Sequence, residues 1–410
     1  MAKLGFGTYR ITDTNQAHID ALTTAIKNGI NFIDTATNFT DGAAHRAIAK
    51  VLPFADQNLQ IVSKFGYIQG RILQRLGENK SLFDAISDSL IPLGKNRFYS
   101  IAPAFLEDQL QLTLEELQTK QLECFMINTP ENILAYHLEQ GVERSTCLSM
   151  LYDAIFDAFV TFEKVVQEGK IKGYGIYSNS FSLKKEEELY FDYEKLIEIA
   201  KEAAIKAGVQ QHHFTMVELP INIAQKEGLF CSFWAKEVGL KVVASQPLSI
   251  TYANKHIRAA QIDGNRDYYM YLNELLEFCD NELLEPLFNL INDLDERVHR
   301  FESIGEYDAF IHQEVLPAIE QVVVKLDDEN KEKLLHLLEL FLEAHREMVG
   351  YECGKKAKQT LQPVLKGCEE PLQLCAVKYL LEQESIDYVV VGARRVKYVY
   401  EFLSLAEKIN

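Results

Sequence analysis

Asn31-Phe32-Ile33-Asp34-Thr35-Ala36-Thr37-Asn38 and Gln60-Ile61-Val62-Ser63-Lys64-Phe65-Gly66 are the two stretches that decide the fold. In each, a short apolar run ends in a charged residue and a polar loop. Similar runs recur along the chain, separated by helical patterns such as Ile19–Lys27 and Leu106–Leu117. This alternation is typical of parallel strands joined by crossover helices.

Eight such strands are predicted, and eight are the number that closes a (β/α)₈ TIM barrel. They are Leu4–Tyr9, Asn31–Asp34, Gln60–Lys64, Leu122–Asn128, Gly173–Tyr177, Phe214–Leu219, Lys241–Ala244 and Asp387–Gly392. An open doubly wound sheet is the rival fold, but no G-x-G-x-x-G follows the first strand into a helix. We therefore expect an α/β protein built on a (β/α)₈ barrel.

The spacing between the seventh and eighth strands is far longer than one βα unit needs, and a structureless loop of that length is improbable. Leu334, Leu335, Leu338 and Leu342 follow a helical period within this interval. We assign residues 253–364 as a mostly α-helical insertion of three or four helices. The barrel domain then comprises residues 1–252 and 365–410. A second long excursion, Phe65–Ala104, follows the third strand.

Composition restricts the class of partner. The 410 residues contain 42 Lys and Arg against 60 Asp and Glu, for a net charge of −18, which argues against nucleic acid as a partner. No apolar run is long enough to span a membrane and no cationic leader precedes an apolar core, so we expect a cytoplasmic protein. The seven cysteines lack any C-x-x-C spacing and are expected to be reduced thiols. The histidines of the insertion include a single Glu296-x-x-His299 spacing, and we expect no metal site.

Polar residues at the carboxyl ends of the strands are the candidate chemistry, because barrel active sites lie at that end. Asp34 and Lys64 end neighbouring strands and are expected to pair in the barrel mouth. Such a pair is either purely structural or part of an active site, and the residues alone leave both open. Ser178 and Asn179 follow the fifth strand and together suit recognition of a carboxamide.

The motifs in this order resemble the aldo-keto reductases. They are Leu4-Gly5-Phe6-Gly7-Thr8-Tyr9, Gly29–Ala36, Ser63–Gly66, Gly169–Gly175, Ser178-Asn179 and Val391-Gly392-Ala393-Arg394. The resemblance implies a (β/α)₈ enzyme that binds NADP, less often NAD, in an extended pose. It also implies hydride transfer between the nicotinamide and a carbonyl or alcohol.

The resemblance further implies a catalytic tetrad of Asp, Tyr, Lys and His, which this chain keeps only in part. Asp34 and Lys64 match, but Phe39 stands in the place of the tyrosine and Asn128 in that of the histidine. A phenyl ring has no proton to give, and general-acid assistance is worth about 10²–10⁴-fold in rate. Lys64 and Asn128 remain as groups that polarise a substrate oxygen. Tyr67 is the first substitute acid to consider, with Tyr99 and Tyr177 behind it.

The resemblance implies a larger set of cofactor contacts. Gly392-Ala393-Arg394-Arg395 leads into a helix, so free N–H groups and two guanidinium groups converge where a phosphate would bind. Glu218 stands where glutamine is usual, and if ionised it favours the positively charged oxidised nicotinamide. The full set of expected cofactor residues is Gly7, Thr8, Tyr9, Ser178, Asn179, Glu218, Ser245, Pro247, Leu248, Gly392, Arg394 and Arg395.

Three functions stay open at this point. The first is an NADP(H)-dependent oxidoreductase acting on a small carbonyl or alcohol. The second is a cofactor-binding pseudo-enzyme, a redox-sensing or assembly protein that docks a partner protein through the helical insertion. The third is an enzyme of elimination or isomerisation that uses Asp34 and Lys64 as an acid–base pair. Fold alone does not choose among them.

Overall fold

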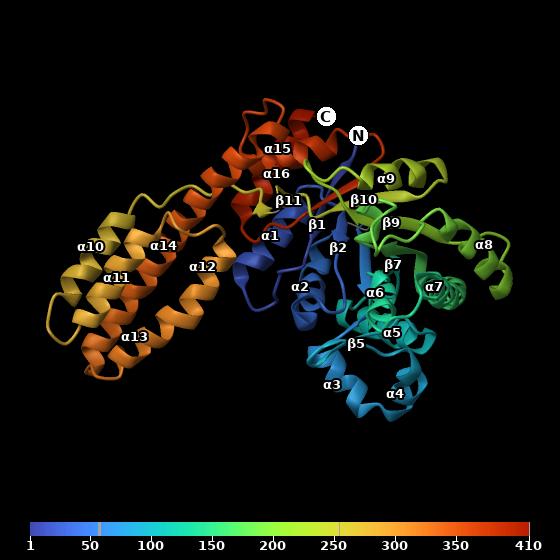
Figure 1. The fold of residues 1–410 in the computed structure, drawn as a ribbon, viewed down its shortest axis with the longest axis horizontal. Coiled ribbons are helices and arrows are strands. Elements are labelled where there is room, and N and C mark those ends of the chain that lie inside the picture. The colour runs from blue at the N-terminus through green and yellow to red at the C-terminus, as the bar shows by residue number, and fades with distance from the viewer. Residues whose placement is uncertain (56–58, 254, 410) are drawn as a thin grey trace. The chain divides into compact units, whose positions relative to one another are not determined.

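A computed structural model describes residues 1–55, 59–253 and 255–409. The chain divides into two compact units, Met1–Pro247 with Val377–Asn410, and Leu248–Ala376 (Figure 1). The first unit is the barrel and the second is mostly helical. Each is described in turn.

Eight parallel strands close the barrel in the order β1-β13-β10-β9-β8-β7-β3-β2. This confirms the predicted (β/α)₈ fold, and the predicted strand ends differ from the observed ones by two residues or fewer. The strands are β1 (Lys3–Gly7), β2 (Phe32–Asp34), β3 (Gln60–Phe65), β7 (Leu122–Asn128), β8 (Ile171–Tyr177), β9 (Phe214–Pro220), β10 (Lys241–Ser245) and β13 (Tyr388–Val391).

Helices follow the strands along the chain and cover the outside of the barrel (Figure 1). Local signals set several of their ends: the Asn15 side chain accepts a hydrogen bond from the Ala17 N–H, and Gly208 ends α8 in the left-handed conformation. The helices are α1 (Gln16–Lys27), α2 (Ala43–Val51), α5 (Pro103–Leu117), α6 (Glu131–Glu139), α7 (Arg144–Gln167), α8 (Lys195–Ala207), α9 (Gly228–Glu237), α15 (Leu372–Leu381) and α16 (Val396–Ile409).

The excursion after β3 folds on its own local elements. It contains α3 (Gly70–Glu78) and α4 (Lys80–Ile86). It also forms a small antiparallel sheet in the order β4-β6-β5, from Tyr67–Ile68, Arg97–Tyr99 and Ile91–Gly94. Tyr99 anchors this sheet at the barrel mouth, because its buried hydroxyl donates a 2.8 Å hydrogen bond to the Asn128 carbonyl.

The interior of the barrel is an apolar cluster contributed by alternate residues of most strands. Successive side chains of a strand point to opposite faces, so the inward residues are spaced by two. The cluster comprises Phe32, Val62, Cys124, Met126, Met216, Val243, Tyr388 and Val390. β1 carries Gly5 at its inward position, where an added Cβ would lie 2.8 Å from Phe32. The barrel is therefore filled, and only its last inward positions are available for chemistry.

The second unit begins with a hairpin, β11 (Ser249–Tyr252) and β12 (Lys255–Arg258), and continues as a helical bundle. A π-helical stretch at Ile311–Val315 joins α12 and α13 without a break, so the bundle has four helical rods, the upper end of the predicted number. Its helices are α10 (Tyr268–Cys279), α11 (Glu285–Arg297), α12 (Ile304–Phe310), α13 (Leu316–Val323) and α14 (Asp328–Leu361). The predicted leucine stripe contributes Leu334 and Leu338 to the buried core.

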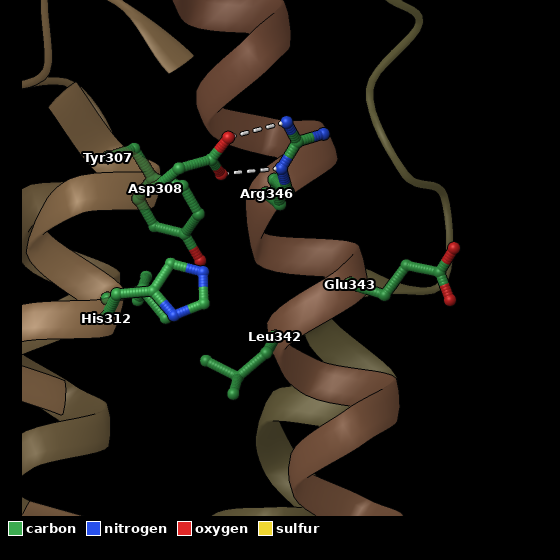
Figure 2. Close-up of a pocket in the computed structure, with 7 residues that line it drawn as sticks. Tyr307, Asp308, His312, Leu342, Glu343 and Arg346 are labelled. Atoms are coloured by element: carbon green, nitrogen blue, oxygen red, sulfur yellow. Dashed lines mark hydrogen bonds and ion pairs between the residues drawn. The ribbon is translucent and has the colours of Figure 1, made fainter. Parts of the chain in front are cut away.

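A hollow of 420 Å³ opens between α12, the π-helical stretch and α14 (Figure 2). Asp308 and Arg346 span one side of it with two hydrogen bonds of 2.7 and 2.9 Å. Deeper in the bundle, the buried His345 ring lies within hydrogen-bond distance of the Tyr307 hydroxyl and the Leu294 carbonyl, and burial lowers the pKa of His345. The hollow is lined by Tyr307, Asp308, Ile311, His312, Leu342, Glu343 and Arg346.

The cysteines depart from the sequence prediction. Cys368 and Cys375 form a disulfide across seven residues, so the expectation that every cysteine is a free thiol is wrong for this pair. The physical reason is the turn before α15, which places the two Cα atoms 6.0 Å apart, within the range that a disulfide requires. The other five cysteines are free, and four of them are buried.

Substitutions at Leu338 and Leu335 test the packing of the helical unit. Both residues lie in α14, but Leu338 is 4% exposed and Leu335 is 45% exposed. Leu338→Ala is expected to lower the free energy of unfolding by roughly 2–5 kcal/mol because it leaves a cavity. Leu335→Ala, the matched control, is expected to cost at most about 1 kcal/mol. Urea denaturation followed by circular dichroism measures both, and equal losses would contradict the packing described.

Candidate active site

The next inward position of each strand, two residues beyond the apolar cluster, forms a ring at the carboxyl end of the barrel. Asp34 follows Phe32, Lys64 follows Val62, and Glu218 follows Met216 in this way. The full ring is Gly7, Asp34, Lys64, Asn128, Tyr177, Glu218, Ser245 and Gly392. The structure thus brings together residues that the sequence nominated separately for catalysis and for cofactor binding, and Tyr177, one of the substitute acids considered from the sequence, is among them.

Three charged groups meet inside this ring. The Lys64 Nζ atom donates hydrogen bonds to Asp34 Oδ1 and to Glu218 Oε2, the latter at 2.8 Å. All three side chains are almost inaccessible, with exposed fractions of 2% for Lys64, 7% for Asp34 and 3% for Glu218. The sequence predicted the contact between Asp34 and Lys64 but not that of Lys64 with Glu218.

The charge balance of this cluster requires a proton. One ammonium compensates one carboxylate, and a second ionised carboxylate would leave an uncompensated charge in a buried place. Burial and the neighbouring Asp34 charge raise the pKa of Glu218 to about 8, although Lys64 opposes this. Burial also raises the pKa of Asp34, against the effect of Lys64. For Lys64, burial alone would lower the pKa, but Asp34 and Glu218 outweigh it and the net shift is upward.

Glu218 is therefore mainly a neutral carboxylic acid at pH 7, and Asp34 is the partner that carries the charge. The proton is assigned to Glu218 because its pKa of about 8 lies above neutrality, which leaves the negative charge to Asp34. The sequence-based expectation that Glu218 favours an oxidised nicotinamide requires an ionised Glu218, and near neutrality Glu218 is mainly protonated.

Two aromatic rings flank the ammonium. Lys64 Nζ lies 5.8 Å from the centroid of the Phe39 ring and 5.7 Å from that of the Tyr177 ring. Phe39 begins a turn in which Thr40 and Asp41 adopt left-handed φ angles of 45° and 52°, a strained backbone of the kind found at functional sites. The Tyr177 hydroxyl donates to Asn179 Oδ1 and accepts from Gln246 Nε2.

Tyr67, the first substitute acid suggested by the sequence, has other partners. Its hydroxyl accepts hydrogen bonds from Thr129 Oγ1 at 2.8 Å and from Asn132 Nδ2 at 3.4 Å. Its ring stacks edge to face on that of Tyr99. Of the three phenols considered from the sequence, Tyr177 is the one whose ring lies against Lys64.

Ser178 and Asn179 are held by a carboxylate that the sequence analysis did not single out. Glu131 Oε2 accepts a 2.7 Å hydrogen bond from Ser178 Oγ, and Oε1 accepts from the backbone N–H and the side-chain amide of Asn179. Glu131 and Ser178 are buried, whereas Asn179 is exposed. The position of Glu131 at the start of α6, next to the end of β7, was the available signal, but its partners on β8 appear only in three dimensions.

The expected cofactor residues that follow β1 and β10 differ in burial and in hydrogen bonding. Thr8 is buried and its hydroxyl donates to the Asp34 carbonyl, which fixes the end of β2, while Tyr9 is exposed and packs edge-on against Phe39. Ser245 is 7% exposed, and its hydroxyl has no hydrogen-bond partner among the described residues. Pro247 ends the first compact unit and Leu248 begins the second.

The turn after β13 presents its arginines outward. Gly392, Arg394 and Arg395 are exposed, and α16 begins directly after them at Val396. At the ring itself, Gly392 and Gly7 carry no side chain, and a Cβ on Gly7 would lie 2.7 Å from Val390.

A buried histidine supports the strand that carries Lys64. His45 lies between Glu116 and Ser63, with Nδ1 to Oε2 at 2.9 Å and Nε2 to Oγ at 3.1 Å. Burial lowers the pKa of His45, so it is neutral, donates to Glu116 and accepts from Ser63. Arg71 reaches Glu116 at 2.7 Å and closes this network from α3. The sequence alone does not indicate a role for His45, because its partners Glu116 and Ser63 lie 71 and 18 residues away along the chain.

In the part of the chain that the structure describes, no group of three or more His, Cys, Asp or Glu is arranged to hold a metal ion. Across the described ranges, no helix combines the length and the apolar character needed to cross a membrane.

Comparison with known proteins decides the family. The model of the aldo/keto reductase family matches residues 3–408. This chain belongs to that family. A search of curated protein sequences finds no match.

Solved structures of aldo-keto reductases are similar in fold. One from Bacillus halodurans, in its holo form, is 14% identical with a TM-score of 0.50, covering 98% of this chain and 86% of that chain. The glycerol dehydrogenase of Gluconobacter oxydans is 14% identical with a TM-score of 0.49, at 98% and 85% coverage. An enzyme from Klebsiella pneumoniae in complex with NADP and acetate is 12% identical with a TM-score of 0.46, at 98% and 84% coverage. At these identities, the Bacillus likeness shows the fold alone.

Removal of the central ammonium tests the charge cluster. Lys64→Met is expected to lower the free energy of unfolding at pH 8 by about 3–5 kcal/mol, because it strands buried carboxylates. Without the cation, the pKa values of Asp34 and Glu218 lie above their unfolded values of roughly 3.9 and 4.3. Stability is then retained below those values and lost as the pH rises, so the loss should be smaller at pH 5 than at pH 8.

Lys172→Met is the control for this test, because Lys172 is 61% exposed and pairs with Glu123 at the surface. Its cost is expected to be at most about 1 kcal/mol at either pH. Urea titrations at both pH values provide the measurement. A Lys64→Met loss that does not grow with pH would contradict the proposed charge balance.

Proposed function

We propose that the protein binds a nicotinamide dinucleotide, NADP(H) in preference to NAD(H), and transfers hydride between it and a small carbonyl or alcohol. The observation that carries the proposal is the buried ammonium of Lys64, set with its two carboxyl partners in the mouth of an aldo-keto reductase barrel. In this family the mouth of the barrel is where the oxygen of a substrate is polarised.

The described residues fit such a cofactor at both of its ends. Ser245, at the end of β10, offers a buried hydroxyl that has no partner within the described chain, and Asn179, after β8, offers an exposed amide at the same end of the barrel. Arg394 and Arg395, exposed at the start of α16, have the charge and geometry to hold a phosphate. The NADP named for the Klebsiella enzyme is the ligand we expect here.

Residues of the chain would position the substrate, and the bound cofactor would supply hydride. Lys64 and Asn128 would polarise the substrate oxygen as negative charge develops on it. Asp34 holds the ammonium in place. Phe39 and Tyr177 wall the site and limit access of water to the ammonium, which strengthens its electrostatic effect. Phe39 cannot donate a proton, so another group must protonate the substrate oxygen.

Titration of the protein with NADPH and NADH, followed by cofactor fluorescence, tests binding. Arg394→Ala and Arg395→Ala are expected to weaken NADPH binding roughly tenfold, the effect of losing one charge-assisted hydrogen bond, and NADH binding by less. Arg300→Ala, an exposed arginine of the helical unit, serves as the control and should change neither affinity. Failure of the wild-type protein to bind either dinucleotide would refute the proposal.

Turnover separates the oxidoreductase from a pseudo-enzyme that docks a partner through its helical unit. Two observations favour the pseudo-enzyme. Ser178 already donates its hydroxyl hydrogen bond to Glu131, and Phe39 has no phenol to donate a proton. NADPH oxidation with aldehydes, ketones and quinones is expected for the oxidoreductase and should collapse in Lys64→Met. Tight binding without oxidation across the panel would support the pseudo-enzyme instead.

A further inference from the structure

The proton required at this site has one well-placed source. A carbonyl that receives hydride needs a proton on its oxygen, and the position expected for a phenol holds Phe39. We infer that Glu218 is the proton donor of this site, with its burial and the neighbouring Asp34 carboxylate keeping its carboxyl in the neutral form. The inference rests on the proposed function and names the acid that it lacks.

Position is the first argument. Glu218 occupies the last inward place of β9, in register with Tyr177 on β8 and Val243 on β10. It therefore faces the barrel mouth in the same ring as Lys64 and Asn128, the groups proposed to polarise the substrate oxygen. Its Oε2 atom lies 2.8 Å from Lys64 Nζ, so an oxygen bound by the ammonium would also lie next to the carboxyl.

Charge is the second argument. With Lys64 positive, Asp34 negative and Glu218 neutral, the buried cluster carries no net charge. The pKa of Glu218, about 8, leaves this carboxyl protonated at neutral pH. Asp34 also faces Glu218, and burial raises its pKa against the effect of Lys64. Lys64 has a raised pKa, burial raises the pKa of Tyr177 further above its usual range, and Ser245 and Val243 on β10 have no charge.

The step balances in atoms and electrons. In the direction of reduction, hydride forms a bond to the carbonyl carbon and the π electron pair of the C=O bond moves to oxygen. The O–H bond of Glu218 breaks as its proton bonds to that oxygen, which gives the alcohol and a Glu218 carboxylate. A bound dinucleotide would supply the hydride with its two electrons and would end in the oxidised form, while Glu218 ends as a carboxylate. The carboxylate then recovers a proton from solvent.

Kinetics of Glu218→Gln provide the test, because glutamine keeps the size of the side chain and removes its acidic proton. We expect NADPH oxidation by 4-nitrobenzaldehyde and phenanthrenequinone to fall by about 10²–10⁴-fold, with NADPH affinity changed less than threefold. Wild-type reduction should decline as the pH rises through about 8, since the acid form is lost, and alcohol oxidation should rise over the same range. In Glu218→Gln both dependences should disappear.

Glu163→Gln is the matched control. Glu163 is equally buried, and it accepts hydrogen bonds from Tyr174 and His213 away from the ring, so its variant measures the structural cost of the same change. Its turnover should stay within a few-fold of wild type, with the pH dependence intact. The Phe39→Tyr change in the Glu218→Gln background should restore reduction, because the new phenol would stand beside Lys64.

A spectroscopic readout is independent of turnover. In protein labelled with ¹³C-glutamate, infrared difference spectra should show a protonated carboxyl band that titrates near pH 8, persists in Glu163→Gln and is missing from Glu218→Gln. Absence of such a band in wild type, unchanged kinetics in Glu218→Gln, or a wild type that binds NADPH yet reduces nothing in the panel would each overturn the inference. NADPH binding itself decides the proposed function, so the two failures are distinguishable.

Discussion

A single ammonium group between two carboxyl groups is the constraint on which this site depends. The side chains of Lys64, Asp34 and Glu218 are almost completely buried. Desolvation of charged groups costs free energy unless opposite charges compensate one another. One proton must therefore stay with the carboxyls. The same cluster closes the apolar interior of the barrel from above and supplies the polar floor of the mouth, so fold stability and chemistry are coupled in it.

Two further carboxylates, those of Glu131 and Glu116, hold residues near the ends of the strands. Glu131 fixes Ser178 and Asn179 after β8, and Glu116 fixes His45 and through it Ser63, the neighbour of Lys64. Each of these contacts joins elements that are distant in sequence. Side-chain hydrogen bonds between strands and helices thus contribute to the rigidity of the mouth alongside the strands themselves. Substitution of Glu131 or Glu116 should therefore loosen the residues that each one holds.

Sequence reasoning gave the barrel because a period-two apolar pattern ending in polar residues is a local signal, readable from Phe32 to Asp34 without any knowledge of neighbours. The resemblance to the aldo-keto reductases also nominated most of the ring, including Glu218 and Ser245. The contact of Lys64 with Glu218 was not accessible, because it joins β3 to β9 across the barrel interior. The Cys368–Cys375 disulfide was missed for a related reason, since a turn, not a motif, brings the two sulfur atoms together.

The late position of β13 affects how this chain can fold. Residues Lys3–Phe6 of β1 pair with β13, yet residues 246–387, which include the helical unit, separate β10 from β13. Closing so long a loop carries an entropic cost that grows slowly with length but slows the search for the partner. During synthesis, the helices can pack before the barrel closes, whereas the edge of β1 facing β13 stays unpaired. That edge is the segment on which a chaperone would act first.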